Sequence, residues 1–198
     1  MKKTIFTLAL LAGLSGAAQA QRNISLGLKA GGTYSSYVGE DADNLKGLFG
    51  FHAGGFVNIG LTKLFAFQPE IIYSQKGTKY DINEDVRQRL HYLDIPLAFH
   101  VNADGLFFEA GPQVGVLLAA SGKAGGFSSD IKSSFNDFDF GYLVGLGYQR
   151  KAGPGIGLRY NGGFVNNTPS AETSIGTLEL RRRNSAFQLY LTYSFGGR

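Results

Sequence analysis

Strict alternation of apolar and polar residues near the end of the chain is the feature that most limits the fold. Phe187, Leu189, Leu191, Tyr193 and Phe195 are apolar, and the residues between them are small or polar. Successive side chains of a β-strand point to opposite faces, so this pattern predicts a strand with one apolar face.

Seven earlier segments follow the same pattern, and their connections alternate in length. The connections at 61–63, 102–105 and 151–154 are short, whereas those at 35–47, 77–89, 121–137 and 165–182 are long and polar. This regularity is typical of an eight-stranded antiparallel up-and-down transmembrane β-barrel with short periplasmic turns and longer extracellular loops. We therefore predict an all-β fold with strands at residues 23–34, 48–59, 64–76, 90–101, 106–120, 138–149, 156–164 and 183–195.

The N-terminus has the pattern of a secretory signal. Two lysines precede an apolar run from Ile5 to Leu14, and Ala18-Gln19-Ala20 has the small residues of a cleavage site. The run is shorter than the roughly 20 residues that a membrane-spanning helix needs. We expect residues 1–20 to be a signal peptide and residues 21–198 to form one outer-membrane barrel domain.

Composition narrows the class of protein. The chain has no cysteine, which excludes a disulfide framework, and its 29 glycines, 16 phenylalanines and 10 tyrosines suit curved sheet. Without the two signal-peptide lysines, the formal net charge of +4 falls to +2, so no nucleic-acid partner is indicated. No segment after the signal has 18 uninterrupted apolar residues, so insertion into a membrane would be by strands.

The alternation predicts an inverted polarity, with apolar side chains facing lipid and polar ones facing the barrel axis. A soluble lipocalin-like barrel, with an apolar interior, is the alternative. Eight strands leave a narrow interior, in which buried charges should pair and plug the lumen. A conducting pore or a proton path is the other interpretation of these inward positions. The charged residues at them are Lys29, Glu70, Lys76, Asp94, Glu109 and Arg159.

Three prolines lie inside the predicted strands. Pro69, Pro96 and Pro112 each lack the backbone N–H that a strand donates to its neighbour. We expect a bulge or weakened pairing at each of them.

Several motifs carry a family resemblance that covers the whole mature chain. They are Gln68-Pro69-Glu70-Ile71-Ile72-Tyr73-Ser74-Gln75-Lys76-Gly77, Tyr92-Leu93-Asp94-Ile95-Pro96-Leu97, Ala110-Gly111-Pro112-Gln113-Val114-Gly115, Gly145-Leu146-Gly147-Tyr148 and Leu158-Arg159-Tyr160. With these motifs the chain resembles the PorT-type outer-membrane β-barrel family of Gram-negative bacteria. The resemblance implies an outer-membrane barrel, and the family's namesake takes part in protein secretion and surface attachment. Members often end on an aromatic residue, whereas here Gly196-Gly197-Arg198 follow Phe195.

Catalytic and metal-binding patterns are weak. His52, His91 and His100 are the only histidines, and no His-Ser-acid spacing unites them into the site of a lipid-modifying enzyme. The acidic residues Glu40, Asp41 and Asp43 lack the spaced ligands of a calcium loop. We therefore expect no enzyme activity, cofactor or metal.

One basic run suggests a contact with the membrane surface. Arg181, Arg182 and Arg183 could bind lipopolysaccharide phosphates at the outer interface, or could form a solvated flank of the last strand.

Taken together, these patterns predict a monomeric barrel of the cell outer membrane. Its role would be structural, surface-interacting or export-associated, with outer-membrane lipid, lipopolysaccharide and envelope or secretion proteins as partners. A small-solute channel is the main alternative, followed by a lipid-modifying enzyme or a soluble binder.

Overall fold

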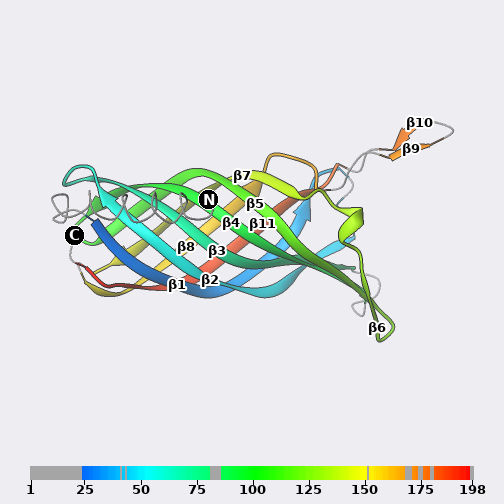
Figure 1. The fold of residues 1–198 in the computed structure, drawn as a ribbon, viewed down its shortest axis with the longest axis horizontal. Coiled ribbons are helices and arrows are strands. Elements are labelled where there is room, and N and C mark those ends of the chain that lie inside the picture. Colours follow the sequence, from blue (N-terminus) through cyan, green and yellow to red (C-terminus); the bar gives the residue numbers. More distant parts are fainter. Residues whose placement is uncertain are drawn as a thin grey trace, which may run out of the picture.

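Eight antiparallel strands close into a barrel in the computed structural model, which describes residues 24–40, 42, 44–80, 86–150, 152–167, 171–173, 176–178 and 181–196 (Figure 1). Consecutive barrel strands pair with each other, and β1 pairs with β11 to complete the ring. The predicted architecture is confirmed, while the predicted signal peptide lies outside the described residues. The barrel strands are β1 (Ile24–Val38), β2 (Leu45–Gly60), β3 (Phe65–Tyr80), β4 (Arg87–Ala103), β5 (Leu106–Ala124), β7 (Phe138–Gln149), β8 (Gly153–Gly163) and β11 (Arg183–Ser194).

Short elements occupy two of the long connections. β6 (Phe127–Asp130) pairs with the last residues of β5 and extends this hairpin away from the barrel (Figure 1). A 3₁₀ helix, η2 (Lys132–Ser134), follows it. β9 (Ala171–Thr173) and β10 (Gly176–Leu178) pair with each other as a small hairpin.

The two ends of the barrel differ in their connections. At one end, here called the short-turn end, only Asp104 and Gly105 separate β4 from β5. Their φ angles are 48° and 91°, the left-handed conformation that a two-residue hairpin turn requires and that Asp-Gly adopts readily. The opposite end, which carries the connections after β1, β3, β5 and β8, is called the long-loop end.

The strands continue further toward the long-loop end than predicted. β1 extends to Val38, β3 to Tyr80 and β5 to Ala124, so the expected loop boundaries at 35–47, 77–89 and 121–137 are wrong. The alternation persists in these extensions, but most of their outward residues, such as Lys79 and Arg87, are polar, as in a loop. Tyr37, an inward residue of the β1 extension, packs with inward residues at the ends of the predicted strands in an apolar group, the mouth cluster, which consists of Tyr37, Leu90, Tyr92, Leu117 and Ala120. Burial of this cluster inside the barrel stabilises the longer strands.

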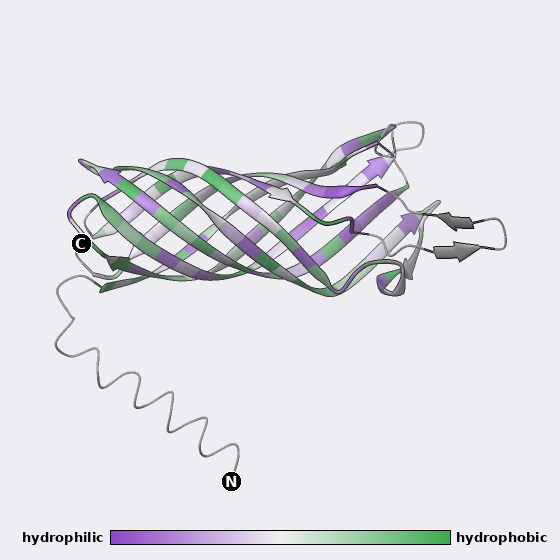
Figure 2. Cartoon of the chain, turned by 90° about the horizontal axis from the view of Figure 1, so that it is seen from above, coloured by the Kyte–Doolittle hydropathy of each residue, from purple (hydrophilic) through white to green (hydrophobic). Residues whose placement is uncertain are grey.

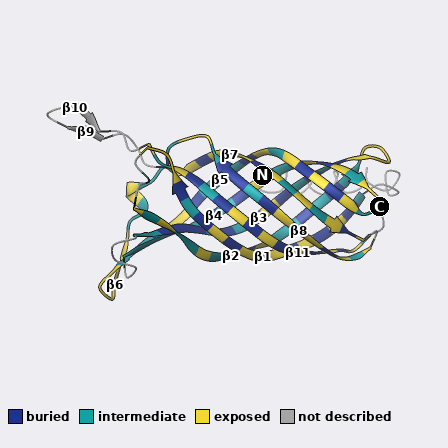
Figure 3. Ribbon diagram, turned by 180° about the vertical axis from the view of Figure 1, so that it is seen from behind, coloured by how far each residue is buried: buried dark blue, intermediate teal, exposed yellow. Residues whose placement is uncertain are grey.

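The outer surface of the barrel wall is apolar and its interior is polar. Exposed and buried residues alternate along every barrel strand (Figure 3), and hydropathy alternates with them (Figure 2). On β2, for example, Phe49 is 75% exposed whereas His52 is 1% exposed. Such a surface is stable in hydrocarbon, where the closed ring also pairs the backbone groups. This arrangement confirms the predicted inversion and excludes the soluble lipocalin-like alternative.

No helix among the described residues has the length and apolar character needed to cross a membrane.

The three strand prolines weaken pairing without changing the register. Pairing of β2 with β3 is interrupted at Pro69, that of β3 with β4 at Pro96, and that of β4 with β5 at Pro112. The register is the same on both sides of each interruption, because the missing donor removes hydrogen bonds without adding a residue. The two irregularities in register lie elsewhere, so the prediction of a bulge or weakened pairing is confirmed as weakened pairing at all three prolines.

Candidate functional site

All six charged residues predicted to face inward are buried inside the barrel, with exposed fractions of 1 to 3%. They come from five strands, because alternate positions on each strand point to the axis. They form two separate groups. The first group, called the Arg159 network, consists of Lys29, Glu70, Glu109 and Arg159 with His100 and Tyr190. The second group, called the Lys76 network, consists of Lys76, Asp94 and Asp139 with Tyr92 and Asn184.

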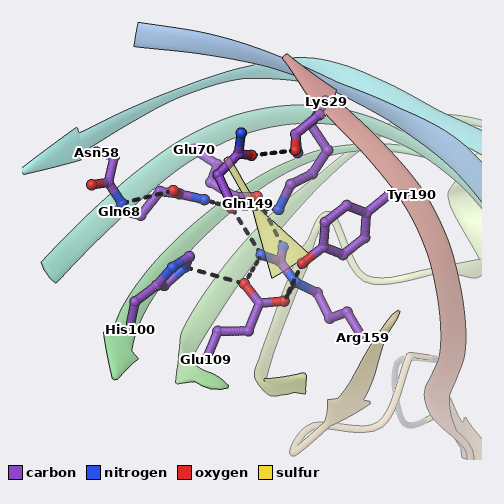
Figure 4. A network of polar contacts seen from close by, with 10 residues as sticks. Lys29, Asn58, Gln68, Glu70, His100, Glu109, Gln149, Arg159 and Tyr190 are labelled. Atoms are coloured by element: carbon purple, nitrogen blue, oxygen red, sulfur yellow. Dashed lines mark hydrogen bonds and ion pairs between the residues drawn. The ribbon is translucent and has the colours of Figure 1, made fainter. Parts of the chain in front are cut away.

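Arg159 on β8 lies between two carboxylates, Glu70 from β3 on the opposite side of the ring and Glu109 from β5, two strands away (Figure 4). Its Nε and Nη2 donate to Glu109 Oε1 and Oε2 at 2.8 and 2.6 Å. Its Nη1 and Nη2 donate to Glu70 Oε2 and Oε1 at 2.9 and 2.8 Å. The guanidinium group therefore makes bidentate contacts with both carboxylates, the geometry in which charge-assisted hydrogen bonds are strongest.

Lys29 and Tyr190 complete this network. Lys29 Nζ donates to Glu70 Oε1 at 2.6 Å and lies 4.1 Å from the centroid of the Tyr190 ring. The Tyr190 hydroxyl donates to Glu109 Oε1 at 2.9 Å, and His100 Nε2 lies 3.3 Å from Glu109 Oε2. Two cationic and two anionic side chains thus balance each other at the barrel axis, as buried charges must when water cannot solvate them.

Inward-facing glycines leave the space that these large side chains occupy. A Cβ atom at Gly157 would lie 2.4 Å from ring and hydroxyl atoms of Tyr190, and one at Gly145 would lie 2.6 Å from Glu109 Oε1. The glycine-rich strands thus allow long polar side chains to cross a narrow lumen.

Amide side chains extend the Arg159 network along the axis. Gln68 Nε2 donates to Glu70 Oε1 at 2.8 Å, and Asn58 Nδ2 donates to Gln68 Oε1 at 2.9 Å (Figure 4). The three residues lie on β2 and β3 toward the short-turn end, and each is buried. Polar side chains therefore fill this part of the lumen as well.

The Lys76 network lies nearer the long-loop end. Lys76 Nζ is 3.0 Å from Asp94 Oδ1 and 3.7 Å from Asp139 Oδ2. Asn184 Nδ2 donates to Asp139 Oδ2 at 2.9 Å and to the Tyr92 hydroxyl at 3.3 Å. Asp139 was not among the charged residues predicted to face inward. Its position between the outward residues Phe138 and Phe140 nevertheless places it on the inner face by alternation.

The lumen is filled in layers. A cavity beside Lys76, Asp139 and Asn184 has a volume of about 10 Å³, which is room for about one water molecule. Tyr92 belongs both to the Lys76 network and to the mouth cluster, so the polar layer continues directly into the apolar one. The described side chains thus form two layers of charge and an apolar cap.

The histidines have structural partners. The Thr33 hydroxyl lies 2.9 Å from His52 Nδ1 inside the barrel, and Tyr73 contacts His91 on the outer face. Within the described part of the chain, no group of three His, Cys, Asp or Glu side chains could hold a metal ion. His52 and His100 thus lie buried in the lumen, whereas His91 lies on the outer face.

The three consecutive arginines at the start of β11 do not converge. Arg181 Nη1 contacts Glu40 Oε2 at 3.2 Å, with both side chains exposed. Arg183 begins β11 opposite Val38, and alternation turns Arg182 to the other face. The arrangement places these arginines at the long-loop end without joining them into one site.

Comparisons with known proteins agree with this architecture. The family model described as "outer membrane protein beta-barrel domain" matches residues 17–196. The solved structure of Neisserial surface protein A has a TM-score of 0.57 and 14% identity, with 88% of this chain and 100% of that chain covered. Ail, the attachment invasion locus protein of Yersinia pestis, has a TM-score of 0.49 and 13% identity, with 87% and 98% covered. At such identities the likeness shows the fold alone. A search of curated proteins finds no match.

Proposed function

This chain belongs to the family of outer membrane protein β-barrel domains and lies in the cell outer membrane, and we propose that it is a closed, non-conducting monomer that presents a surface for interaction outside the cell. The long-loop end then faces outward, because outer-membrane barrels have short periplasmic turns and long extracellular loops.

The observation that carries this proposal is the double bidentate contact of Arg159. Side chains from β3, β5 and β8 meet at the axis through four hydrogen bonds of 2.6 to 2.9 Å. A hydrated ion would have to separate these groups and leave buried charges without partners, which costs several kcal/mol per ion. The lumen is thus better suited to hold the barrel rigid than to conduct.

The mouth cluster supports the same conclusion at the long-loop end. Leu90 and Leu117 are 0 and 2% exposed, although they lie beyond the Lys76 network on strands that end in the extracellular space. Ions are excluded from apolar constrictions because these provide no replacement for the hydration shell. A small-solute channel would need both the apolar cap and the charged layers to move.

The surface role rests on the extended hairpin of β5 and β6. Gly125 and Gly126 form its turn with φ angles of 55° and 90°, and Phe127 next to them is 84% exposed. An aromatic side chain at the tip of a paired hairpin provides a preorganised contact for a partner. This hairpin is the part of the described surface that best fits recognition.

Planar lipid bilayer recording tests the proposal directly. The purified mature chain should insert without steady conductance steps, while a general porin in the same chamber should give them. Insertion would be verified by protease protection of the reconstituted protein. Reproducible ohmic steps from the inserted wild-type barrel would contradict the closed lumen.

An export-associated role is a second candidate, favoured by the PorT-type resemblance of the motif Tyr92-Leu93-Asp94-Ile95-Pro96-Leu97. In that role the barrel would anchor envelope components of a secretion pathway rather than conduct substrate. Purification from cross-linked outer membranes should then recover secretion components, and wild-type secretion in a deletion strain would contradict it.

A further inference from the structure

Four basic residues form a continuous row across the outer face of the barrel at the long-loop end. Lys46 on β2 pairs with Lys79 on β3, Lys79 pairs with Arg87 on β4, and Arg87 pairs with Lys123 on β5. Arg89 lies two residues further along β4 on the same face. We call these five residues the cationic row.

The side chains of this row point away from the barrel interior. On β4, Leu90 and Tyr92 are buried in the mouth cluster, so Arg87 and Arg89 face outward. Thr78 is buried inside, which turns Lys79 outward in the same way. The row therefore lies on the surface that meets the surroundings of the barrel.

Like charges placed directly opposite each other on neighbouring strands destabilise a sheet. Inside the barrel, each charged group has a partner of opposite sign. In the outer row, by contrast, Arg87, Arg89 and Lys123 make no ion pair with any acidic side chain of the described residues. Lys46 and Lys79 do take part in other interactions. Among the described residues these three adjacent cations lack acidic partners, and they present a surface suited to an anion from outside the chain.

The position of the row identifies the environment of that anion. Along the outward face of β4, Arg89 and His91 are followed by Leu93, Ile95 and further apolar residues down to Val101. Twelve positions separate Arg89 from Val101, which is about 30 Å along the axis at 3.3 Å per residue and a tilt of about 40°. The hydrocarbon layer has about this thickness. Arg89 therefore lies where the acyl chains end and the headgroups begin.

We propose that the cationic row binds the phosphate groups of lipopolysaccharide in the outer leaflet. Arginine forms bidentate hydrogen bonds with phosphate, and lysine adds mobile donors. Three gaps between neighbouring strands make the row about 14 Å long, enough for more than one phosphate group. The apolar wall directly below the row would pack against the acyl chains of the same lipid. This combination of a phosphate-binding row above an apolar wall distinguishes a lipid headgroup from a soluble anion.

The row is better arranged for this role than the run Arg181-Arg182-Arg183. Alternation divides those three arginines between two faces, and Arg181 already contacts Glu40. The row of β2 to β5, by contrast, brings its charges to one face in one line across neighbouring strands.

The test compares three variants with wild type in binding of fluorescent lipopolysaccharide, measured with protein in neutral detergent micelles at fixed salt. The first variant is Arg87→Gln/Lys123→Gln. The matched control is Lys63→Gln/Arg150→Gln, which removes one lysine and one arginine from exposed positions at the short-turn end. The third variant is Arg181→Gln/Arg182→Gln/Arg183→Gln. Heat-modified mobility on gels verifies that each barrel is folded.

Each basic residue near an anionic headgroup layer contributes roughly a fivefold increase in affinity. The first variant should therefore bind lipopolysaccharide about tenfold to thirtyfold more weakly, and the control within about twofold of wild type. Enzymatic dephosphorylation of the lipopolysaccharide should weaken wild-type binding to a similar extent. Conductance measurements do not enter this result, so it is independent of whether the lumen is closed.

Several outcomes would overturn the assignment. Equal affinity of the first variant and wild type would remove the row as the site. A comparable loss in the control would show a general charge effect, and a loss confined to the third variant would move the site to the start of β11. Competition by inorganic phosphate at micromolar concentration would indicate a site for soluble phosphate rather than for lipid.

Discussion

Replacement of Arg159 by methionine should strongly destabilise the barrel. The substitution removes four hydrogen bonds of 2.6 to 2.9 Å and leaves Glu70 and Glu109 buried with Lys29 as the remaining cation of their network. Removal of one partner from a buried ion pair costs about 3–5 kcal/mol, because the charge that remains is uncompensated. We expect a loss of this size in the free energy of unfolding.

Urea titration of barrels folded into vesicles, followed by intrinsic tyrosine fluorescence and gel mobility, measures this loss. Arg150→Met, at an exposed arginine in a short turn, is the matched control and should change the unfolding free energy by about 0.5 kcal/mol or less. The double variant Arg159→Met/Glu109→Gln restores the charge balance. Its loss in unfolding free energy should be about 1–3 kcal/mol smaller than the sum of the losses of the two single variants. A loss below about 1 kcal/mol for Arg159→Met, or strict additivity in the double variant, would refute the reasoning.

Three further substitutions probe other parts of the barrel, each by the same urea titration. Leu189→Arg places a charge on the lipid-facing surface and should cost about 2–4 kcal/mol near the middle of the bilayer; a neutral effect would argue against lipid contact. Gly105→Val should cost about 1–3 kcal/mol, because the φ angle of 91° is strained for valine and its Cβ would lie 2.6 Å from the Tyr148 ring. Gly157→Val should cost about 1–3 kcal/mol by displacing Tyr190, and unchanged stability would show that the lumen is less tightly filled than described.

The alternation of residues predicted which side chains face inward because the strand repeat is independent of the rest of the fold. Lys29 follows Leu28 and precedes Ala30, and this local pattern alone assigns it to the interior. The same argument placed Glu70 and Arg159. A lipid-facing wall strengthens the signal, since hydrocarbon requires apolar side chains at every outward position.

The partners of these side chains could not be predicted from local pattern. Arg159 meets Glu70 across 89 positions of sequence and Glu109 across 50, so their contact depends on closure of the ring and on the register of every strand between them. The separation of Lys76 from the Arg159 network has the same origin. The alternation pattern places Asp139 on the inner face, but only the folded barrel shows that it is an anionic partner of Lys76.

The lengths of the strands were predicted least well, and the reason is chemical. Outward residues of the strand extensions, such as Lys79 and Arg87, are polar because they lie in the headgroup layer or in water. Where the outward residues are polar, the apolar and polar alternation that identifies a strand is lost, and the segment has the composition of a loop. The inward residue Tyr37, in the extension of β1, was the evidence for continued strand, since a solvated loop has no reason to bury it.

Fluorescence of two single-tryptophan variants tests the inverted barrel most directly, because the chain contains no tryptophan of its own. Leu189→Trp and Tyr190→Trp alter neighbouring residues that are 59 and 1% exposed on opposite faces of β11. In vesicles of lipid brominated along the acyl chains, emission from position 189 should be strongly quenched and emission from position 190 should be largely protected. Equal quenching at both positions, or stronger quenching at position 190, would contradict a barrel with its apolar face toward lipid and its charged face toward a closed axis.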